Sequence, residues 1–440
     1  MMEEENGRPS MGRGKGGDGA LERKEKLQVG ATLFIGLGFF ASSLLWSIYN
    51  SFVPLILQDF IKSTTAVGLI MTIDNVFGVI FQPLFGAISD RTRTPIGKRM
   101  PYIILGAPIC GILFVFIPRM GHLWSLMLLI ITFNLIMSIW RSPMIALMPD
   151  LTPDPLRSKA NGIINLMGGI ASIVAFLVGG KIAHAYGRGA TFLMGAAVMI
   201  LAVGVLFLRV REPALGPWRI ELLEGEQSMA GGRFGLESFQ KLPKNERKSL
   251  LFLLLAIFFW FCAYNAVETF FTSYATNRLG MSDGQAAMLL AFFSVSFVLF
   301  AVPSGFLAQR IGRRKTIILG LLGLVLVFLP ILFIENLLAI RILLLLGGLF
   351  WALININSLP MVLELAGPSE LGTFTGYYYF FSFSASIASP ILFGLIRDLS
   401  GTFGSLFLYA PIAFALALGC FIQVTHGLGN PQSESIAPPK

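Results

Sequence analysis

The sequence predicts an all-α membrane protein with twelve transmembrane helices, arranged as two six-helix pseudo-repeats. Three observations predict this fold class: the composition, the length of the apolar runs, and a pattern that recurs about 215 residues further along the chain. Hydrophobic residues make up 55% of the chain and charged residues 13%, and the mean hydropathy is +0.74. A composition this apolar excludes an ordinary soluble domain.

The apolar runs define the expected helices. Most of them reach the roughly 20 residues that a helix needs to cross a hydrocarbon core of about 30 Å. They lack the apolar–polar alternation of a membrane β-barrel, and a helix satisfies its own backbone hydrogen bonds in lipid. The expected helices cover residues 29–57, 65–89, 101–118, 122–148, 160–186, 189–209, 249–278, 283–309, 315–334, 337–365, 371–397 and 401–425.

Four short patterns recur in one register, with offsets between 214 and 219 residues. They are Trp46-x-x-Tyr49-Asn50 with Phe261-x-x-Tyr264-Asn265, Gly86-x-x-x-Asp90-Arg91 with Gly305-x-x-x-Gln309-Arg310, Pro143-Met144 with Pro360-Met361, and Gly162 and Ala171-Ser172-Ile173 with Gly376 and Ala385-Ser386-Ile387. Each match alone is weak, but together they indicate two similar halves. Two such repeats form a central site with alternating access in many secondary transporters.

The chain divides into five expected segments. A bundle at 29–209 and a second bundle at 249–425 are separated by the one long polar stretch inside the chain, 210–248, which we interpret as a linker that includes an interfacial helix. Residues 1–28 and 426–440 have the polar, Gly-rich or Pro-rich composition of disordered tails.

The distribution of Lys and Arg predicts the orientation. With residue 1 in the cytoplasm, the inner segments hold 25 of the 33 cations and the outer loops hold five. This asymmetry follows the positive-inside rule and predicts that both termini are cytoplasmic, in what we expect to be the plasma membrane. The asymmetry also accounts for the net charge of +9, so a nucleic-acid partner is not predicted. The expected surroundings are a lipid bilayer, and the expected state is a monomer.

The loop between the second and third expected helices carries the strongest local motif. It contains Gly86, Asp90, Arg91 and the run Gly97-Lys98-Arg99. A Gly one turn before an Asp lets two membrane helices approach closely, and the Asp can then pair with cations or meet a helix N-terminus. We expect this cluster to latch the two halves at the cytoplasmic side. The same gate is expected to include Asp150, Gly305, Arg310, Arg313, Arg314 and Glu364. The alternative is that these cations only set the topology.

This motif resembles the loop signature of the major facilitator superfamily. The longer strings that carry the resemblance are Gln82-Pro83-Leu84-x-Gly86-x-x-Ser89-Asp90-Arg91, Gly97-Lys98-Arg99-x-Pro101-Tyr102-Ile103 and Pro143-x-x-Ala146-Leu147-x-x-Asp150-Leu151. They are similar to those of the sucrose-transporter and solute-carrier branch of the glycoside–pentoside–hexuronide:cation symporters. The resemblance covers residues 29–425 and implies proton-coupled uptake of a disaccharide or related glycoside. It also implies that helices 1, 2, 4, 5, 7, 8, 10 and 11 line the cavity.

Two positions depart from that pattern. Where the melibiose-type branch carries an Asp pair that helps bind Na⁺, this sequence has Gly78 and Gln82, so a Na⁺ site of that type is not supported. Where sucrose transporters carry an Arg two residues after the helix 4 proline, this sequence has Ile145. Arg141 lies one turn before Ile145 and is expected to serve the same face.

Three ionisable residues fall deep inside expected spans, namely Asp74, Arg141 and Glu268. Each costs roughly 2.5–3.5 kcal/mol to insert, so each needs a partner or a wet cavity. An apolar wall favours the neutral carboxyl, and a nearby cation favours the carboxylate. We therefore expect Asp74 to carry the coupling proton with Arg141 as its partner, and Glu268 to be the rival proton site or a sugar ligand. A static buried ion pair or a helix-capping Asp is the structural alternative.

A neutral sugar needs amide or carboxylate groups for paired hydrogen bonds and an aromatic surface for its apolar face. The repeated aromatic-x-x-Tyr-Asn pattern supplies both from each half. The expected substrate-binding residues are Trp46, Tyr49, Asn50, Arg141, Tyr264, Asn265, Glu268, Trp351, Asn355, Asn357 and Tyr378. For each aromatic residue, packing or an interfacial belt is the alternative.

The leading hypothesis is a proton-coupled sugar or glycoside symporter, with the proton as coupling ion and neither a cofactor nor a metal. One alternative is a proton-coupled exporter of amphipathic compounds, which would favour an aromatic and Met-lined cavity with few amides. Another is a non-transporting receptor with the same fold, for which expensive intramembrane charges have no evident use. An enzyme is not expected, because the sequence shows no nucleophile–base constellation, metal-ligand spacing or phosphate loop.

Overall fold

The computed structural model describes residues 29–152, 156–212, 239, 242–366 and 370–425, and the regular elements among them are all helices. Twelve of the helical segments in these ranges are long and apolar enough to cross a membrane, which confirms the predicted fold class. The predicted tails at 1–28 and 426–440 and the predicted interfacial helix of the linker lie outside the described residues. The first membrane helix of the second half begins at Lys244, inside the predicted linker.

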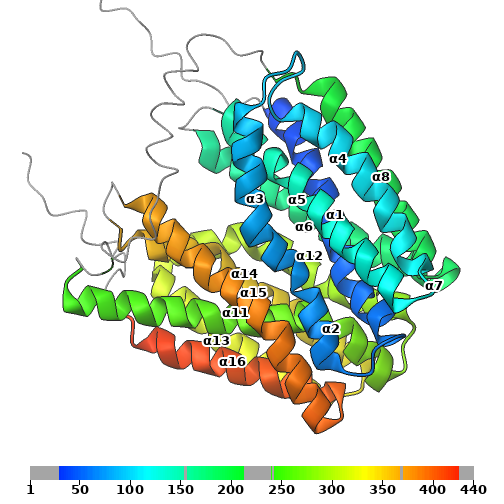
Figure 1. Cartoon of the computed structure of the whole chain (residues 1–440). Helices are drawn as coiled ribbons and strands as arrows, with labels where there is room; N and C mark the ends of the chain where they lie inside the picture. The colour runs from blue at the N-terminus through cyan, green and yellow to red at the C-terminus, as the bar shows by residue number, and fades with distance from the viewer. Residues whose placement is uncertain (1–28, 153–155, 213–238, 240–241, 367–369, 426–440) are drawn as a thin grey trace, which may run out of the picture.

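The first half contains six spans (Figure 1). They are α1 (Val29–Gln58), α2 (Thr64–Met71) followed by α3 (Ile73–Arg91), α4 (Met100–Phe116) with the 3₁₀ turn η1 (Ile117–Arg119), α5 (Leu123–Leu151), α6 (Arg157–Val174) with the π turn η3 (Ala175–Gly179) and α7 (Gly180–Tyr186), and α8 (Arg188–Arg209). Within this half, α1 packs on α6 and α8, and α5 packs on α3 and α4.

The second half contains the other six spans. They are α11 (Lys244–Leu279), α12 (Asp283–Ile311), α13 (Arg313–Ile331), α14 (Leu337–Leu363), α15 (Leu371–Ser400), and η4 (Phe403–Ser405) with α16 (Leu406–Ile422). Here α11 packs on α15 and α16, and α14 packs on α12 and α13. Figure 1 shows the two halves as separate bundles, the first in blue to green and the second in green to red.

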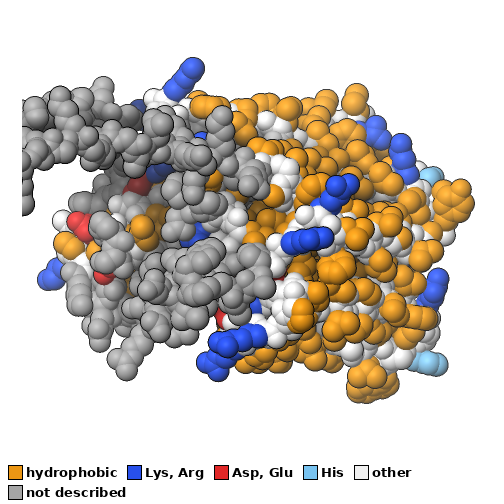
Figure 2. Space-filling view, turned by 90° about the horizontal axis from the view of Figure 1, so that it is seen from above, with side chains coloured by type: hydrophobic (Ala, Val, Ile, Leu, Met, Phe, Trp, Pro, Cys, Tyr) orange, Lys and Arg blue, Asp and Glu red, His pale blue; other side chains and the backbone are white. Residues whose placement is uncertain are grey.

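The outer surface of both bundles is apolar, as contact with lipid tails requires. Leucines on four different helices leave about two thirds of their surface exposed: Leu105 67%, Leu201 69%, Leu299 66% and Leu326 71%. Figure 2 shows that hydrophobic side chains cover most of the described surface on the face it presents. A soluble protein exposes mainly polar side chains, whereas this surface exposes apolar ones. It fits the lipid surroundings predicted from composition.

Two spans of the first half are interrupted within their length. The second span breaks at Thr72, which ends α2 and precedes α3, although neither Gly nor Pro is present at the break. The fifth span contains the π turn η3, which packs against α12 of the other half. Single π turns inside α-helices are frequent at functional sites. The apolar runs predicted both spans but neither interruption.

The two halves meet at one end of the molecule. We name the two ends by the predicted orientation, so that the loop 92–99 lies at the inner face and the loop 59–63 at the outer face. Toward the outer face, α2 packs on α15 and α7 packs on α12 (Figure 1). Glycines allow these contacts: a Cβ on Gly68 would lie 2.2 Å from the Pro390 carbonyl oxygen, and one on Gly284 would lie 2.2 Å from the Gly180 carbonyl oxygen.

Candidate functional site

A cavity of about 690 Å³ lies between the two halves. We call it the central cavity. Its volume falls within the roughly 300–1,000 Å³ that is typical of small-molecule sites. It is lined by Ser43, Trp46, Ser47, Asn50, Met71, Asp74, Asn75, Gly78, Gln82, Arg141, Ile145, Ser172, Asn265, Glu268, Thr269, Tyr379, Phe383, Ser386 and Pro390. Most of these residues carry hydrogen-bonding side chains, which is unusual for the middle of a membrane protein and indicates a polar occupant.

The repeat found in the sequence places equivalent residues in this cavity. Asn50 of α1 and Asn265 of α11 both line it, as the repeated Tyr-Asn pair predicts. Ser172 of α6 and Ser386 of α15, the centres of the repeated Ala-Ser-Ile pattern, line it as well. Two pairs of hydrogen-bonding groups thus face the cavity from opposite halves.

Asp74 is the second residue of α3 and follows the break at Thr72 directly. Its Oδ1 accepts hydrogen bonds from the backbone nitrogen of Asn75 at 2.6 Å and from Asn75 Nδ2 at 2.8 Å. Both residues line the central cavity. The break in the second span therefore places a carboxylate beside the N-terminus of α3, where the helix dipole favours negative charge.

Arg141 of α5 lies in the same cavity and interacts electrostatically with Asp74. Its guanidinium carbon is 5.7 Å from the centre of the Trp46 ring, within the range of a cation–π contact. Its Nε is buried and has no hydrogen-bond partner among the described residues. The guanidinium thus keeps one donor unsatisfied in this conformation.

Glu268 of α11 completes the group of intramembrane charges. It lines the central cavity, lies within hydrogen-bonding reach of the Asn50 side chain, and interacts electrostatically with Asp74. Asn50 and Glu268 belong to different halves. The structure therefore brings together the three residues expected to couple a proton, two carboxylates and one guanidinium, and their role in coupling stays a prediction.

Several residues expected to bind substrate lie elsewhere. Tyr49 is fully buried inside the first half, where it stacks on Phe133 at 5.5 Å and its hydroxyl accepts from Asn134 Nδ2 at 3.4 Å. Asn357 is buried and donates to the Leu353 carbonyl at 2.9 Å. Asn355, on the same helix α14, is not among the lining residues of the central cavity. The packing alternative therefore describes Tyr49 in this structure, and Asn357 is likewise buried away from the cavity.

On α15 the lining tyrosine is Tyr379, not Tyr378. Tyr378 is 7% exposed, and its hydroxyl is paired with Ser358 Oγ at 3.1 Å. The two residues point about 100° apart on a helix, and three consecutive tyrosines gave no signal for choosing between them. Gly78 and Gln82 also line the central cavity. The sequence did not predict them as substrate-binding residues and marked them only as departures from a Na⁺ site.

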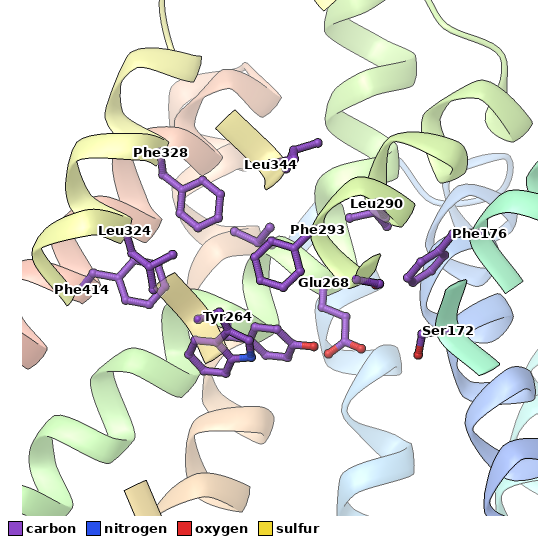
Figure 3. A pocket seen from close by; sticks show the side chains of 13 residues that line it. Ser172, Phe176, Tyr264, Glu268, Leu290, Phe293, Leu324, Phe328, Leu344 and Phe414 are labelled. Carbon is purple, nitrogen blue, oxygen red and sulfur yellow. The ribbon is translucent and has the colours of Figure 1, made fainter. Parts of the chain in front are cut away.

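A second, smaller cavity of about 50 Å³ adjoins Glu268, and we call it the apolar chamber. It is lined by Ser172, Phe176, Tyr264, Val267, Glu268, Leu290, Phe293, Ser294, Leu324, Phe328, Leu344, Trp351 and Phe414. Tyr264 stacks on Trp351 with ring centres 4.4 Å apart, so these two predicted substrate residues face the chamber and not the central cavity. Figure 3 shows the Glu268 carboxylate between Ser172 and the hydroxyl end of Tyr264.

The charged cluster at the inner face lies within the first half. Lys98 Nζ is 3.0 Å from Asp150 Oδ2 and 3.6 Å from Asp90 Oδ1, and Arg99 also pairs with both carboxylates. Arg99 Nη1 donates to the Gly86 carbonyl at 3.1 Å. Arg91, by contrast, is exposed at the surface. In this state the cluster joins the ends of α3, α4 and α5, and a latch across the halves stays a prediction.

Gly97 has a structural role that the sequence motif did not reveal. Its φ of +110° favours glycine, and a Cβ there would lie 2.2 Å from Glu212 Oε2. That same oxygen accepts from the backbone nitrogen of Arg99 at 2.8 Å. Glu212, at the end of the sixth span, thus caps the start of α4 and holds the loop that carries Lys98.

The corresponding inner cluster of the second half is simpler. Arg313 pairs with Glu364, which joins the start of α13 to the end of α14. Arg314 Nη2 donates to the Ile422 carbonyl at 2.8 Å, while Arg310 is exposed. A Cβ on Gly305 would meet nothing within 4 Å, so the close helix approach expected there is absent. At Gly86 of α3 the expected close helix approach is present, because a Cβ there would lie 3.1 Å from Ser142 Oγ of α5.

The outer face carries polar contacts that cross between the halves. Asp398 of α15 accepts from the backbone nitrogens of Thr64 at 2.8 Å and Thr65 at 2.9 Å, and from Ser63 Oγ at 2.7 Å. The second half thereby caps the N-terminus of α2. Arg188 of the first half pairs with Asp283 of the second and, at 2.5 Å, with Asp59 of its own half. Sequence reasoning did not single out Asp398 or Arg188.

Two helical bundles with a polar, charged cavity between them define a class of integral multi-pass membrane proteins, and comparison with known families gives the family. A family model of the Major Facilitator Superfamily matches residues 35–285 and 253–438. The chain belongs to this superfamily. The prediction of a transporter and not an enzyme agrees with that membership.

The similar curated proteins differ in their substrates. The isoprimeverose transporter of Lactiplantibacillus pentosus is 21% identical over 305 residues, which are 65% of this chain and 60% of that protein. The multidrug resistance protein MdtG of Escherichia coli is 24% identical over 315 residues, which are 70% of this chain and 73% of that protein. The match thus spans less than two thirds of the isoprimeverose transporter's length.

Solved structures support the fold. The nucleoside transporter NupG has a TM-score of 0.67 at 14% identity, over 90% of this chain and 99% of that chain. A bacterial homologue of the human lysosomal transporter Spinster, in an inward-facing and occupied conformation, has a TM-score of 0.65 at 15% identity, over 90% of this chain and 93% of that chain. At these identities the likeness shows the fold alone.

Proposed function

We propose that the protein is a proton-coupled symporter that imports a neutral sugar or glycoside by alternating access. The observation that carries the proposal is the lining of the central cavity, where Asn50, Gln82 and Asn265 stand beside Asp74 and Glu268. Amides both donate and accept hydrogen bonds, as a vicinal diol does, and carboxylates accept from hydroxyls. We further propose a monomer in the plasma membrane with both termini in the cytoplasm.

Coupling would follow from the arrangement of the charges. Asp74 interacts with both Arg141 and Glu268, so its two neighbours have opposite effects on its charge. Asp74 and Arg141 belong to the first half, whereas Glu268 belongs to the second. Motion of one half against the other would therefore change the distance from Asp74 to Glu268 while the distance to Arg141 is kept. A proton taken up by one carboxylate would relieve the repulsion between them, which ties protonation to the relative position of the halves.

The likeness to MdtG supports a second candidate, export of amphipathic compounds. Such an exporter would favour an aromatic and Met-lined cavity. In the central cavity, Met71 is the lone methionine among the described lining residues, and the amides outnumber it. The polar lining, together with the isoprimeverose transporter as a relative, favours the sugar.

Uptake into proteoliposomes tests the proposal. Purified protein would be reconstituted and given labelled sucrose, maltose or glucose under an imposed inward pH gradient, and separately under an imposed Na⁺ gradient. Accumulation that follows the pH gradient alone is the expected result. Absence of accumulation under both gradients would contradict the proposal and favour amphipathic export substrates.

Asp74→Asn should abolish proton-driven accumulation while leaving downhill exchange, because the amide keeps the shape of the side chain but cannot carry the proton. Counterflow and pH-driven uptake, measured on the same vesicles, separate these two activities. Ser386→Ala is a matched control, since Ser386 lines the same cavity without an ionisable group. Accumulation that survives Asp74→Asn would assign the proton to Glu268.

A further inference from the structure

The apolar chamber beside Glu268 has no role in the proposed transport mechanism. Apart from Glu268, Ser172 and Ser294 its walls are aromatic and aliphatic, with Phe293, Phe328 and Phe414 among them, and most of them come from the second half (Figure 3). Protein interiors are normally packed without such voids. An apolar void that adjoins the central cavity therefore requires an explanation.

The chamber and the central cavity share two lining residues, Glu268 and Ser172. Both carry oxygen atoms, and because they line both cavities they mark where the chamber adjoins the central cavity. The boundary is thus polar, and beyond it the lining is apolar except for Ser294 and the polar ends of Tyr264 and Trp351. A molecule held by hydrogen bonds in the central cavity could place one apolar substituent past Glu268 without burying a polar group in the chamber.

The volume of the chamber limits that substituent. A water-sized group needs roughly 10–15 Å³ of such volume, so about 50 Å³ accommodates a chain of about three or four carbon atoms. Cavities with apolar walls stay dry and bind apolar molecules. A free sugar would leave this space empty, whereas a short alkyl group would fill it.

We propose that the apolar chamber is a subsite for a short, unbranched alkyl group carried by the transported sugar, so that the preferred substrates are short-chain alkyl glycosides. The proposal rests on the proposed function, because it assumes that the sugar ring occupies the central cavity. It adds a substrate class that the polar lining alone does not predict.

A chain-length series tests the subsite. Proteoliposomes would take up labelled glucose, or whichever sugar accumulates in the uptake assay, in competition with n-alkyl β-glucosides from methyl to octyl. Each buried methylene should lower the concentration for half-inhibition about fourfold. The gain should stop near propyl or butyl, and the matching free alcohols should compete far more weakly. A flat series, or a gain that continues to octyl as for partition into lipid, would overturn the proposal.

Two substitutions on α13 provide a matched pair. Leu324 lines the chamber and is fully buried, whereas Leu326, two residues further, is 71% exposed. Leu324→Phe should fill the chamber and make inhibition by ethyl, propyl and butyl glucosides equal to that by methyl glucoside, with uptake of the free sugar retained. Leu326→Phe should keep the wild-type series. Equal series in the two variants would contradict the subsite.

A second variant keeps the test informative if Leu324→Phe fails to fold. Phe414→Leu removes part of a ring from the chamber wall and should move the best competitor to a longer chain by one or two carbons. An optimum that does not move would contradict the proposal.

The outcomes separate this proposal from the proposed function. If a sugar is taken up but inhibition does not depend on the length of the alkyl chain, the proposed function stands and the subsite is excluded. If neither sugars nor glucosides bind, the proposed function fails, and a structure determined under xenon pressure then tests the chamber by itself. Xenon in the chamber would support an apolar subsite, and a chamber without xenon would remove it.

Discussion

The outer and inner faces of the protein are held together in different ways. At the outer face, Asp398 of the second half caps α2 of the first, and Arg188 of the first half pairs with Asp283 of the second. At the inner face, the ion pairs of Lys98 and Arg99 stay within the first half, and that of Arg313 stays within the second. Among the described residues, the contacts of Asp398 and the Arg188–Asp283 pair cross between the halves at the outer face, whereas the ion pairs of Lys98, Arg99 and Arg313 at the inner face do not.

This difference identifies the conformation as closed on the outer side. Met71 and Pro390, which line the central cavity, lie next to the close contact of Gly68 with Pro390, so the cavity ends there. From that end the lining continues along α3 to Gln82 and along α15 to Tyr379, toward the inner face. A transporter in this state would release its substrate at the inner face. In the proposed import direction, the outer contacts are those that would break before a new substrate enters.

The largest expected effect is at a glycine of the outer closure. Gly284→Ala would place a Cβ 2.2 Å from the Gly180 carbonyl oxygen, and backbone atoms cannot move aside as a flexible side chain can. Overpacking of this kind costs about 1–3 kcal/mol, a shift of roughly 5- to 150-fold toward the outer-open state. Labelling of a cysteine introduced at Met71→Cys with an impermeant thiol reagent, applied from outside, should rise accordingly.

Gly189→Ala is the control, because a Cβ there would meet nothing within 4 Å. The native cysteines would be replaced first, since the chain holds three. Labelling that is equal in Gly284→Ala and Gly189→Ala would show that the α7–α12 contact does not limit opening.

Asp398→Ala should give the next largest effect. The substitution removes the acceptor for the backbone nitrogens of Thr64 and Thr65 and for the Ser63 hydroxyl. Hydrogen bonds to a charged group contribute about 1.5–3 kcal/mol. Water can replace part of what is lost at this partly exposed site, so we expect the lower end of that range and a rise of about tenfold in labelling at position 71. Thermal unfolding in detergent provides the control: a large loss of stability with unchanged labelling would assign Asp398 to folding and not to closure.

Arg188→Gln should open the outer face only slightly. Its partners Asp59 and Asp283 are 57% and 26% exposed, and exposed ion pairs contribute about 0–1 kcal/mol. We expect a rise in labelling of up to about fivefold that disappears at high salt, because salt screens the wild-type pair. A salt-independent rise would point to packing by the Arg188 side chain instead of its charge.

Asp90→Asn should shift the protein toward the inner-open state, opposite to the other three substitutions, and its effect should be the smallest of the four. Asp90 is 47% exposed and pairs with Lys98 and Arg99 in the present state. If Asp90 also latches the halves when the outer face is open, its loss favours the inner-open state, by up to about threefold for so exposed a pair. Labelling at position 71 should fall, and labelling of a cysteine near the inner face should rise. No change at either position would remove the latch.

The sequence predicted the twelve helices and the equivalence of the two halves because both depend on long, regular patterns. Those patterns also located Asn50 and Asn265 in the central cavity, and they marked Ser172 and Ser386, which line it as well. The charged residues were located for a simpler reason. Burial of Asp74, Arg141 and Glu268 in lipid is expensive, so a polar cavity was the expected place for them.

The sequence could not predict which aromatic side chains point into the central cavity. The helices are apolar all round, so periodicity does not tell the cavity side from the packed side. Tyr49 and Tyr378, which were predicted to bind substrate, lie on the packed side in this structure. The break at Thr72 has neither Gly nor Pro to mark it, and the Gly179-Gly180 pair at the end of the π turn is only one of several glycine pairs in the apolar runs. The outer closure was missed because its residues come together only in the folded chain.

The glycine contacts of the outer closure have a consequence for how this protein can diversify. The closure at Gly68 and Gly284 rests on backbone atoms of the opposite half, which every sequence shares, while the central cavity and the apolar chamber are lined by side chains. Substitutions in the lining can therefore change which compound is carried without altering the seal. A few substitutions in the lining can thus change the range of substrates, while the backbone contacts that close the outer face stay the same.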